Sequence, residues 1–208
     1  MRTTEGGLRE RHKAQRRRRI LDATRELLRD EPESVPSAER IAERAAVAPA
    51  TVYNLIGPRE KIWEALAAGF MDQLEDRLAG LDADDPREVV GSTVRLFVDD
   101  PVVSRRMVRG WEESGLVFDR GPLVQLRGAM AHARAHGLLR EDIDTDALAA
   151  VVATSCVGAL HQWVAGLIDD GRFLARALFA LDVALAAAAA DPHRDRLLAP
   201  LRTRGGAR

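Results

Sequence analysis

The stretch VAPATVYNLIGPREKIW, Val47–Trp63, contains a short helix-like segment, a Gly-Pro break and a second helix start. Pro49 stands at the favoured first position of a short helix, which the sequence predicts to end near Ile56. Gly57 ends that helix, and Pro58 begins the next one immediately afterwards. The pattern therefore predicts a helix of about two turns with a sharp break at each end.

The short helix has two different faces. At 100° per residue, Val52, Leu55 and Ile56 share one side, while Ala50 and Asn54 lie on the opposite side. The first side is apolar and is expected to face a core. The second side carries small or compact polar groups, which suits a helix that enters the major groove of DNA.

Two more helices are predicted upstream of this stretch. Apolar residues recur at helical spacing through a first helix over about 9–29, and Ser37 is a good N-cap for a second helix over 38–45. A tight turn at residues 46–47 connects the second helix to the third. The inward residues of the second helix share a small core with the other two; they are Ile41, Ala42 and Ala45.

The charge is unevenly distributed along the chain. The 208 residues carry a net charge of −1, but residues 1–20 carry +6 and residues 62–208 carry −5. A basic N-terminal segment on an acidic protein favours a local contact with a polyanion over non-specific binding by the whole surface. Residues 1–12 are expected to form an arm along the DNA backbone or in a minor groove.

The outward residues of the third helix suit specific contacts with DNA. Asn54 can pair with adenine N6 and N7, and Ala50 can touch a thymine methyl group. The hydroxyls of Thr51 and Tyr53 can bond to phosphates on the groove walls. Arg59 lies in the first turn of the following helix, where free backbone N–H groups also attract anions.

The segments RRRRILDATRELL, Arg16–Leu28, and SAERIAERAAVAPATVYNLIGPREKIWEAL, Ser37–Leu66, resemble the DNA-binding region of the TetR (tetracycline repressor) family of transcriptional regulators. The resemblance implies an all-α fold of about nine helices. Residues 1–57 would form the arm and helix-turn-helix headpiece, and residues 58–208 a helical domain for ligand binding and dimerisation. The expected partners are double-stranded DNA, an unidentified small-molecule effector and a second copy of the chain, without a cofactor. The expected DNA-binding residues are Arg16, Arg17, Ser37, Pro49, Ala50, Thr51, Tyr53, Asn54 and Arg59.

The sequence departs from the family pattern at several positions. Ala46 replaces the usual turn glycine, which predicts a left-handed alanine at a cost of about 1 kcal/mol. Ala48 replaces the usual serine cap of the third helix. Leu55 stands where histidine is common, and Glu39 stands where a basic residue is common. The segment EPESVP replaces the usual link between the first two helices.

The C-terminal half reads as helices separated by turn signals, over about 58–79, 87–98, 102–113, 122–136, 144–168 and 172–190, with a frayed tail from 193. By resemblance, the last two long helices pair with their copies in a dimer. A small, weakly polar stripe supports this interpretation, although a core helix inside one chain is the alternative. The expected interface residues are Ala150, Thr154, Gly158, His161, Ala165, Val183 and Ala187.

A ligand cavity is expected among the middle helices, although bulky residues at helical spacing are also typical of an ordinary core. Its candidate lining residues are Phe97, Met107, Trp111, Glu112, Phe118, Met130, His161 and Trp163. The pair His132 and His136 has a spacing that can bind a metal, but no cysteine lies nearby and no metal site is expected. Cys156 reads as an inert apolar residue.

Residues 147–168 lack charged side chains over a length that can span a membrane. Their alanine and glycine content and acidic flanks favour a buried or interface helix instead, and the single cysteine fits a reducing cytoplasm. Three functions stay open: a ligand-responsive repressor on a palindromic operator, a DNA-binding regulator controlled by a protein partner, and an all-α enzyme. The common catalytic motifs are absent from the sequence, so an enzyme is not expected.

Overall fold

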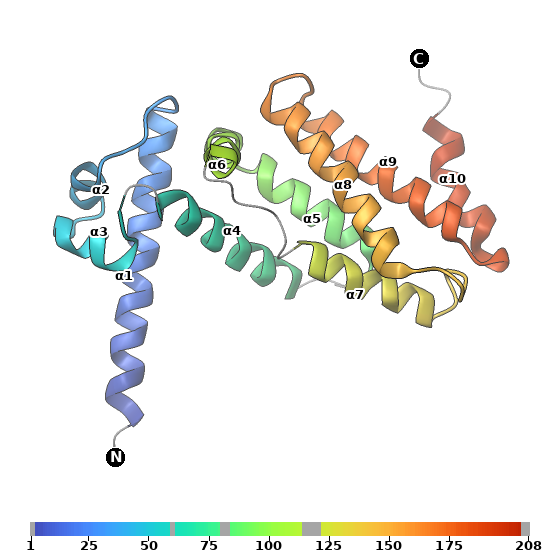
Figure 1. Ribbon diagram of the computed structural model, residues 1–208, viewed down its shortest axis with the longest axis horizontal. Helices are drawn as coiled ribbons and strands as arrows, with labels where there is room; N and C mark the ends of the chain where they lie inside the picture. The colour runs from blue at the N-terminus through green and yellow to red at the C-terminus, as the bar shows by residue number, and fades with distance from the viewer. Residues whose placement is uncertain (1–2, 59–60, 80–83, 114–121, 205–208) are drawn as a thin grey trace. The chain divides into compact units, whose positions relative to one another are not determined.

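The computed structural model describes residues 3–58, 61–79, 84–113 and 122–204. Within these ranges the fold is all-α, and the described residues form no strand (Figure 1). The helices are α1 (Thr3–Asp30), α2 (Ala38–Arg44), α3 (Pro49–Leu55), α4 (Lys61–Ala79), α5 (Pro86–Val98), α6 (Pro101–Glu113), α7 (Pro122–Ala135), α8 (Thr145–Val164), α9 (Asp170–Ala188), a 3₁₀ turn (Asp191–His193) and α10 (Arg194–Arg204). The predicted all-α class is confirmed.

The structure corrects the prediction at both ends of the chain. Residues 3–12, expected to be an arm, continue α1 as helix from Thr3. The tail, expected to fray from residue 193, forms α10 as far as Arg204. The described chain therefore has ten α-helices where about nine were expected. Both misses concern polar segments, in which hydrophobic periodicity gives little indication of a helix.

The chain divides into two compact units, Met1–Asp72 with Asp100–Val117, and Gln73–Asp99 with Phe118–Arg208. The first unit holds α1 to α3, the beginning of α4, and α6. The second holds the end of α4 together with α5 and α7 to α10. The functional division after residue 57 stays a prediction, whereas packing places α6 with the N-terminal helices.

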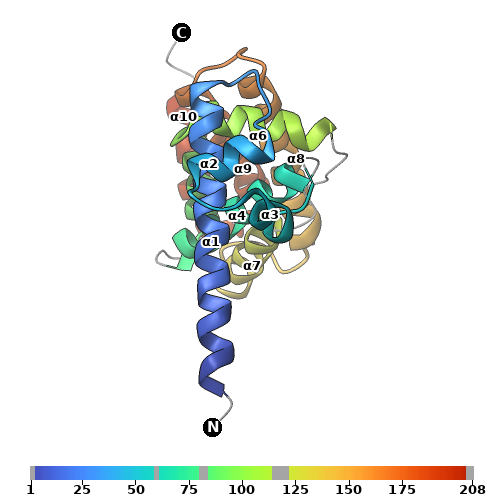
Figure 2. The same cartoon turned by 90° about the vertical axis from the view of Figure 1, so that its left-hand side faces the viewer.

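The first unit is built around the C-terminal half of α1. Leu28, Ile41 and Val52 are almost completely buried, so each of the first three helices contributes to one core. Figure 2 shows α2 and α3 beside the upper half of α1, while the N-terminal half of α1 continues beyond them. The guanidinium of Arg29 donates two hydrogen bonds to the Asp100 carboxylate, at 2.6 and 2.9 Å, and so ties the end of α1 to the start of α6.

The turn between α2 and α3 contains the backbone strain that the sequence predicts. Ala46 has a φ of +51°, and it is the one non-glycine residue with positive φ in the described chain. The N-cap of α3, Ala48, makes no side-chain cap hydrogen bond. Both departures from the family pattern therefore remove stabilisation from the turn that positions α3.

We expect Ala46→Gly to raise the free energy of unfolding by about 1 kcal/mol, because glycine adopts a left-handed conformation without the Cβ clash. Urea unfolding followed by circular dichroism measures the change. The control is Ala131→Gly, at an exposed position inside α7. It should lower stability by about 0.5–1 kcal/mol. Destabilisation by both substitutions would contradict the assignment of strain to Ala46.

The second unit packs α8 between α7 and α9. Aspartates cap three of its helices: Asp85 caps α5, Asp144 caps α8 and Asp169 caps α9. In the core, the rings of Trp163 and Phe173 stack with centroids 5.4 Å apart. The second unit therefore has an ordered aromatic centre, set by helices whose start points are specified by local capping.

The helix α8 is, among the described helices, the one long and apolar enough to cross a membrane. Its inner side is nevertheless part of a protein core, with Ala149, Val152 and Trp163 each 0% exposed. It is a core helix of the second unit, as the sequence interpretation favoured.

Candidate nucleic-acid interface and ligand cavity

The helix α3 presents the polar face that its sequence predicts. Val52 is buried at 1% exposure, whereas Tyr53 is 50% exposed. Asn54 and Ala50 are exposed, and Thr51 is half-buried. Because a short helix with one anchored face must leave its other face in solvent, these groups are available to a partner outside the unit.

A basic groove lies between α1 and α3. Its volume is about 290 Å³, and its residues come from one face of α1 and the polar face of α3: Arg9, His12, Lys13, Arg16, Thr51, Asn54 and Leu55. The three cations follow helical spacing at positions 9, 13 and 16, so they share one side of α1. The groove thus brings a row of positive charge beside hydroxyl and amide groups, which is the donor set that phosphates and base edges require. Arg9 falls within residues 1–12, which the sequence predicts to contact DNA, and Lys13 extends the candidate site beyond them.

The neighbouring arginines of α1 have different roles. Arg16 lines the groove, but Arg17 turns inward, and its Nη1 donates to the carbonyl of Leu55 at 2.6 Å. Arg19 Nη2 donates in the same way to the carbonyl of Ala45 at 2.6 Å. These bonds satisfy carbonyls at the C-terminal ends of α3 and α2, where a positive charge also complements the helix dipole. In this structure Arg17 holds the end of α3, and its contact with DNA stays a prediction.

The start of α2 carries a negative charge. The Ser37 hydroxyl accepts the backbone N–H of Arg40 at 3.3 Å and caps the helix. Hydrogen bonds from the backbone N–H of Glu39 and from the Ser37 hydroxyl lower the pKa of the Glu39 carboxyl below its ordinary value. An ionised carboxylate therefore lies at the same helix start as Ser37, and the contact of Ser37 with DNA stays a prediction.

Some predicted residues lie outside what the structure describes. Arg59 and Phe118 fall outside the described residues. The backbone of Trp111 and Glu112 belongs to α6, but their side chains are not among those described. Their roles in DNA or ligand binding stay predictions.

The outer face of α8 and α9 is apolar and exposed in the single chain. The predicted interface residues Thr154, Gly158, His161, Ala165, Val183 and Ala187 are all exposed, and Ala150 is half-buried. The sequence interpretation missed the large members of this face, namely Val151 (61% exposed) on α8 and Phe179 (44%) on α9. Exposed apolar side chains on two adjacent helices are typical of a surface that another protein surface covers.

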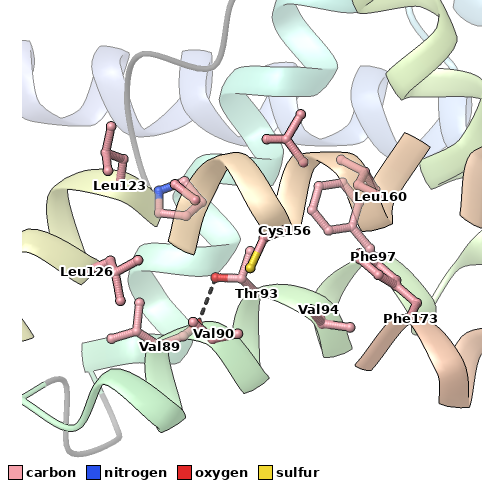
Figure 3. Close-up of a pocket in the computed structure, with 13 residues that line it drawn as sticks. Val89, Val90, Thr93, Val94, Phe97, Leu123, Leu126, Cys156, Leu160 and Phe173 are labelled. Carbon is pink, nitrogen blue, oxygen red and sulfur yellow. Dashed lines mark hydrogen bonds between the residues drawn. The ribbon is translucent and has the colours of Figure 1, made fainter. Parts of the chain in front are cut away.

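The second unit contains an apolar cavity of about 90 Å³. Figure 3 shows its walls, which come mainly from α5, α7 and α8. The lining residues are Val89, Val90, Thr93, Val94, Phe97, Pro122, Leu123, Leu126, Ala153, Cys156, Val157, Leu160 and Phe173.

Of the predicted pocket residues whose side chains the structure describes, only Phe97 lines this cavity. Met130 and Trp163 are completely buried elsewhere in the core of the second unit, and His161 is exposed. Met107 is buried in the first unit. The sequence interpretation selected large aromatic and thioether side chains, whereas the cavity lies where branched aliphatic residues leave a gap.

Cys156 forms part of the cavity wall. Burial raises the pKa of its thiol to about 11, because the apolar surroundings disfavour the thiolate. The thiol is therefore protonated at neutral pH and is a poor nucleophile, as the sequence interpretation expected.

We expect N-ethylmaleimide to label folded Cys156 at pH 7.5 at least about 100-fold more slowly than the chain unfolded in guanidinium, because the thiolate fraction falls tenfold for each unit of pKa. Since Cys156 is the single cysteine in the sequence, mass spectrometry of the whole protein gives the rate directly. Equal rates in the two states would contradict the buried position of the thiol.

Comparisons with known proteins support the fold. No protein-family model matches the sequence, and no curated protein sequence matches it either. Solved structures do match over most of the chain. A protein from Mesorhizobium loti MAFF303099 that is assigned to the TetR family is 15% identical, with a TM-score of 0.61 over 86% of this chain and 98% of that chain.

Two other neighbours carry more specific descriptions. SmeT, the repressor of the Stenotrophomonas maltophilia multidrug efflux pump SmeDEF, is 24% identical, with a TM-score of 0.57 over 84% of this chain and 91% of its own. TylP, a TetR regulator from Streptomyces fradiae, is 20% identical, with a TM-score of 0.52 over 88% of this chain and 91% of its own. The chain therefore has the fold of the TetR-family regulators, which confirms the resemblance at the level of fold.

Proposed function

We propose that this protein is a transcriptional regulator, a repressor that binds a palindromic DNA operator as a homodimer and responds to a small molecule in the cytoplasm. The observation that carries the proposal is the basic groove between α1 and α3, in which Arg9, Lys13 and Arg16 lie beside Thr51 and Asn54. Cations there would neutralise the phosphates of one strand while α3 reads base edges in the major groove.

The exposed apolar face of α8 and α9 supports the dimer. If α8 and α9 of one chain packed against α8 and α9 of a second copy, the interface would cover Val151, Phe179 and Val183. The two headpieces would then be related by a two-fold axis. Two such headpieces match two half-sites of a palindrome, about one helical turn apart or a multiple of that spacing.

The apolar cavity favours a small molecule over a protein partner as the effector. A domain that is controlled only by contact with another protein requires no internal cavity. A small-molecule effector does require one, and by binding one conformation of the protein it increases the fraction of molecules in that conformation. The crystallised complex of SmeT with triclosan gives a precedent for a small apolar ligand on this fold. The described residues that line this cavity offer no acid, base or nucleophile in an ionised state.

Selection of bound fragments from random double-stranded DNA tests the proposal. At about 150 mM salt, weak binding to phosphates alone is suppressed. We expect the unmodified chain to enrich a palindromic motif, and the double variant Thr51→Ala/Asn54→Ala to enrich none. Glu33→Ala, at an exposed position before α2, is the control and should enrich the same motif.

Circular dichroism would first establish that the double variant folds. A folded, dimeric wild-type protein that enriches no motif would contradict the proposed function. If the double variant enriched the same motif, the proposal that α3 recognises the base sequence would be wrong.

A further inference from the structure

Among the residues that the structure describes, those lining the cavity in the second unit carry no group that is charged at neutral pH. Eleven of its thirteen lining residues are aliphatic, proline or phenylalanine, and the other two are Thr93 and Cys156. The Thr93 hydroxyl donates to the carbonyl of Val89 at 2.8 Å within its own helix, as the dashed line in Figure 3 indicates. Its donor capacity is therefore already used.

The thiol of Cys156 does not supply a charge either, because it is protonated at neutral pH. An ionised ligand would lose its hydration on entering this wall without gaining an ion pair, and an unpaired buried charge is very costly. An apolar ligand loses little and gains contact with aliphatic surface. The chemistry of the wall is therefore expected to exclude charged ligands whatever their shape.

The size of the cavity restricts the ligand further. Its volume is about 90 Å³. A dry protein cavity of about 150 Å³ is known to hold benzene, so a single small ring fills this space with a modest outward shift of its wall. Pro122, Leu123, Ala153 and Val157 are only half-buried, so the cavity reaches the surface on that side. A longer molecule can therefore place its apolar end inside and leave the remainder outside.

We propose that the cavity formed by α5, α7 and α8 binds an uncharged apolar molecule, or the uncharged apolar end of a longer one, and excludes carboxylates and ammonium groups. The inference rests on the proposed function, since it defines the chemical class of the effector. It goes further in predicting which molecules the protein rejects.

Three probes of similar shape test the rule: toluene, benzoate and benzylammonium. Thermal unfolding and calorimetry of the full chain at pH 7.5 give the binding of each. We expect toluene to raise Tm and to bind at least about 100-fold more tightly than either ion. Equal binding of benzoate or benzylammonium would overturn the proposal, and so would the failure of all three probes to bind.

Two substitutions locate the site. Ala153→Leu adds volume to the cavity wall and should abolish the effect of toluene, whereas Ala131→Leu, on an exposed position of α7, should preserve it. If Ala153→Leu does not fold, protection of Cys156 gives the location instead, because bound toluene should slow its reaction with N-ethylmaleimide and benzoate should not. Toluene binding without protection would place the probe elsewhere and overturn the proposal.

The two proposals fail separately. Selective binding of toluene by a chain that selects no DNA motif would leave the cavity rule intact and contradict the proposed regulator. A chain that selects a palindromic motif but binds no probe would support the proposed regulator and contradict the cavity proposal. The same conclusion would follow if the chain bound the two ions as tightly as toluene.

Discussion

Replacing Arg9, Lys13 and Arg16 together with alanine is expected to weaken operator binding by about 100-fold at 150 mM salt without changing the preferred sequence. Each neutralised phosphate contributes about 0.9 to the slope of log K against log salt concentration. Loss of three contacts should therefore reduce the slope by about 2.7, which corresponds to about two decades of affinity at this salt concentration. Fluorescence anisotropy from 50 to 300 mM salt measures both quantities.

The matched control for this experiment lies on the same helix. Arg11 and Arg18 are exposed but do not line the groove. The double variant Arg11→Ala/Arg18→Ala should therefore leave most of the slope intact. If both variants lost the same amount of operator affinity for each charge removed, binding would depend on the total positive charge of α1 and not on the groove beside α3.

The double substitution Phe179→Asp/Val183→Asp is expected to convert the proposed dimer to a monomer. Both side chains are 44% exposed on α9, on the apolar face that a second copy would cover. Each new carboxylate would be buried without a partner in the interface, which is strongly unfavourable. Sedimentation velocity at micromolar concentration measures the change, and operator affinity should fall at least about 100-fold because only one half-site is held at a time.

Val124→Asp is the control for this second variant. Val124 is 55% exposed, but it lies on α7, away from the proposed interface. The substitution should leave the dimer unchanged. A wild-type chain that sediments as a monomer, or a dimer that survives both aspartates on α9, would contradict the use of this face for self-association.

Much of the first unit was predictable from local sequence. The Ser37 cap, the proline at the start of α3 and the position of Ala46 each act within a few residues, so the order α2–turn–α3 follows without knowledge of the rest of the chain. The apolar face of α3 was predictable as well, because helical period alone places Val52 opposite Asn54.

The lining of the cavity was not predictable in the same way. A gap in a core arises from the difference between the volume that several helices enclose and the volume that their side chains fill. That difference in volume depends on how α5, α7 and α8 pack together, so it cannot be predicted from the sequence of any one of them. Selecting the largest residues therefore identified Met130 and Trp163, which fill space, while Val157 and Leu126, which border the gap, were missed.

Local sequence alone predicted the ends of most helices to within a few residues, which side of α2 and α3 faces inward, and that positive charge gathers at the N-terminal end. These properties follow from capping, steric limits on φ and helical period, all of which act over a few residues. Only the tertiary structure decided that Arg16 faces the groove while Arg17 binds the carbonyl of Leu55. The two arginines are chemically identical neighbours that point about 100° apart, and which of them meets α3 depends on how distant helices pack.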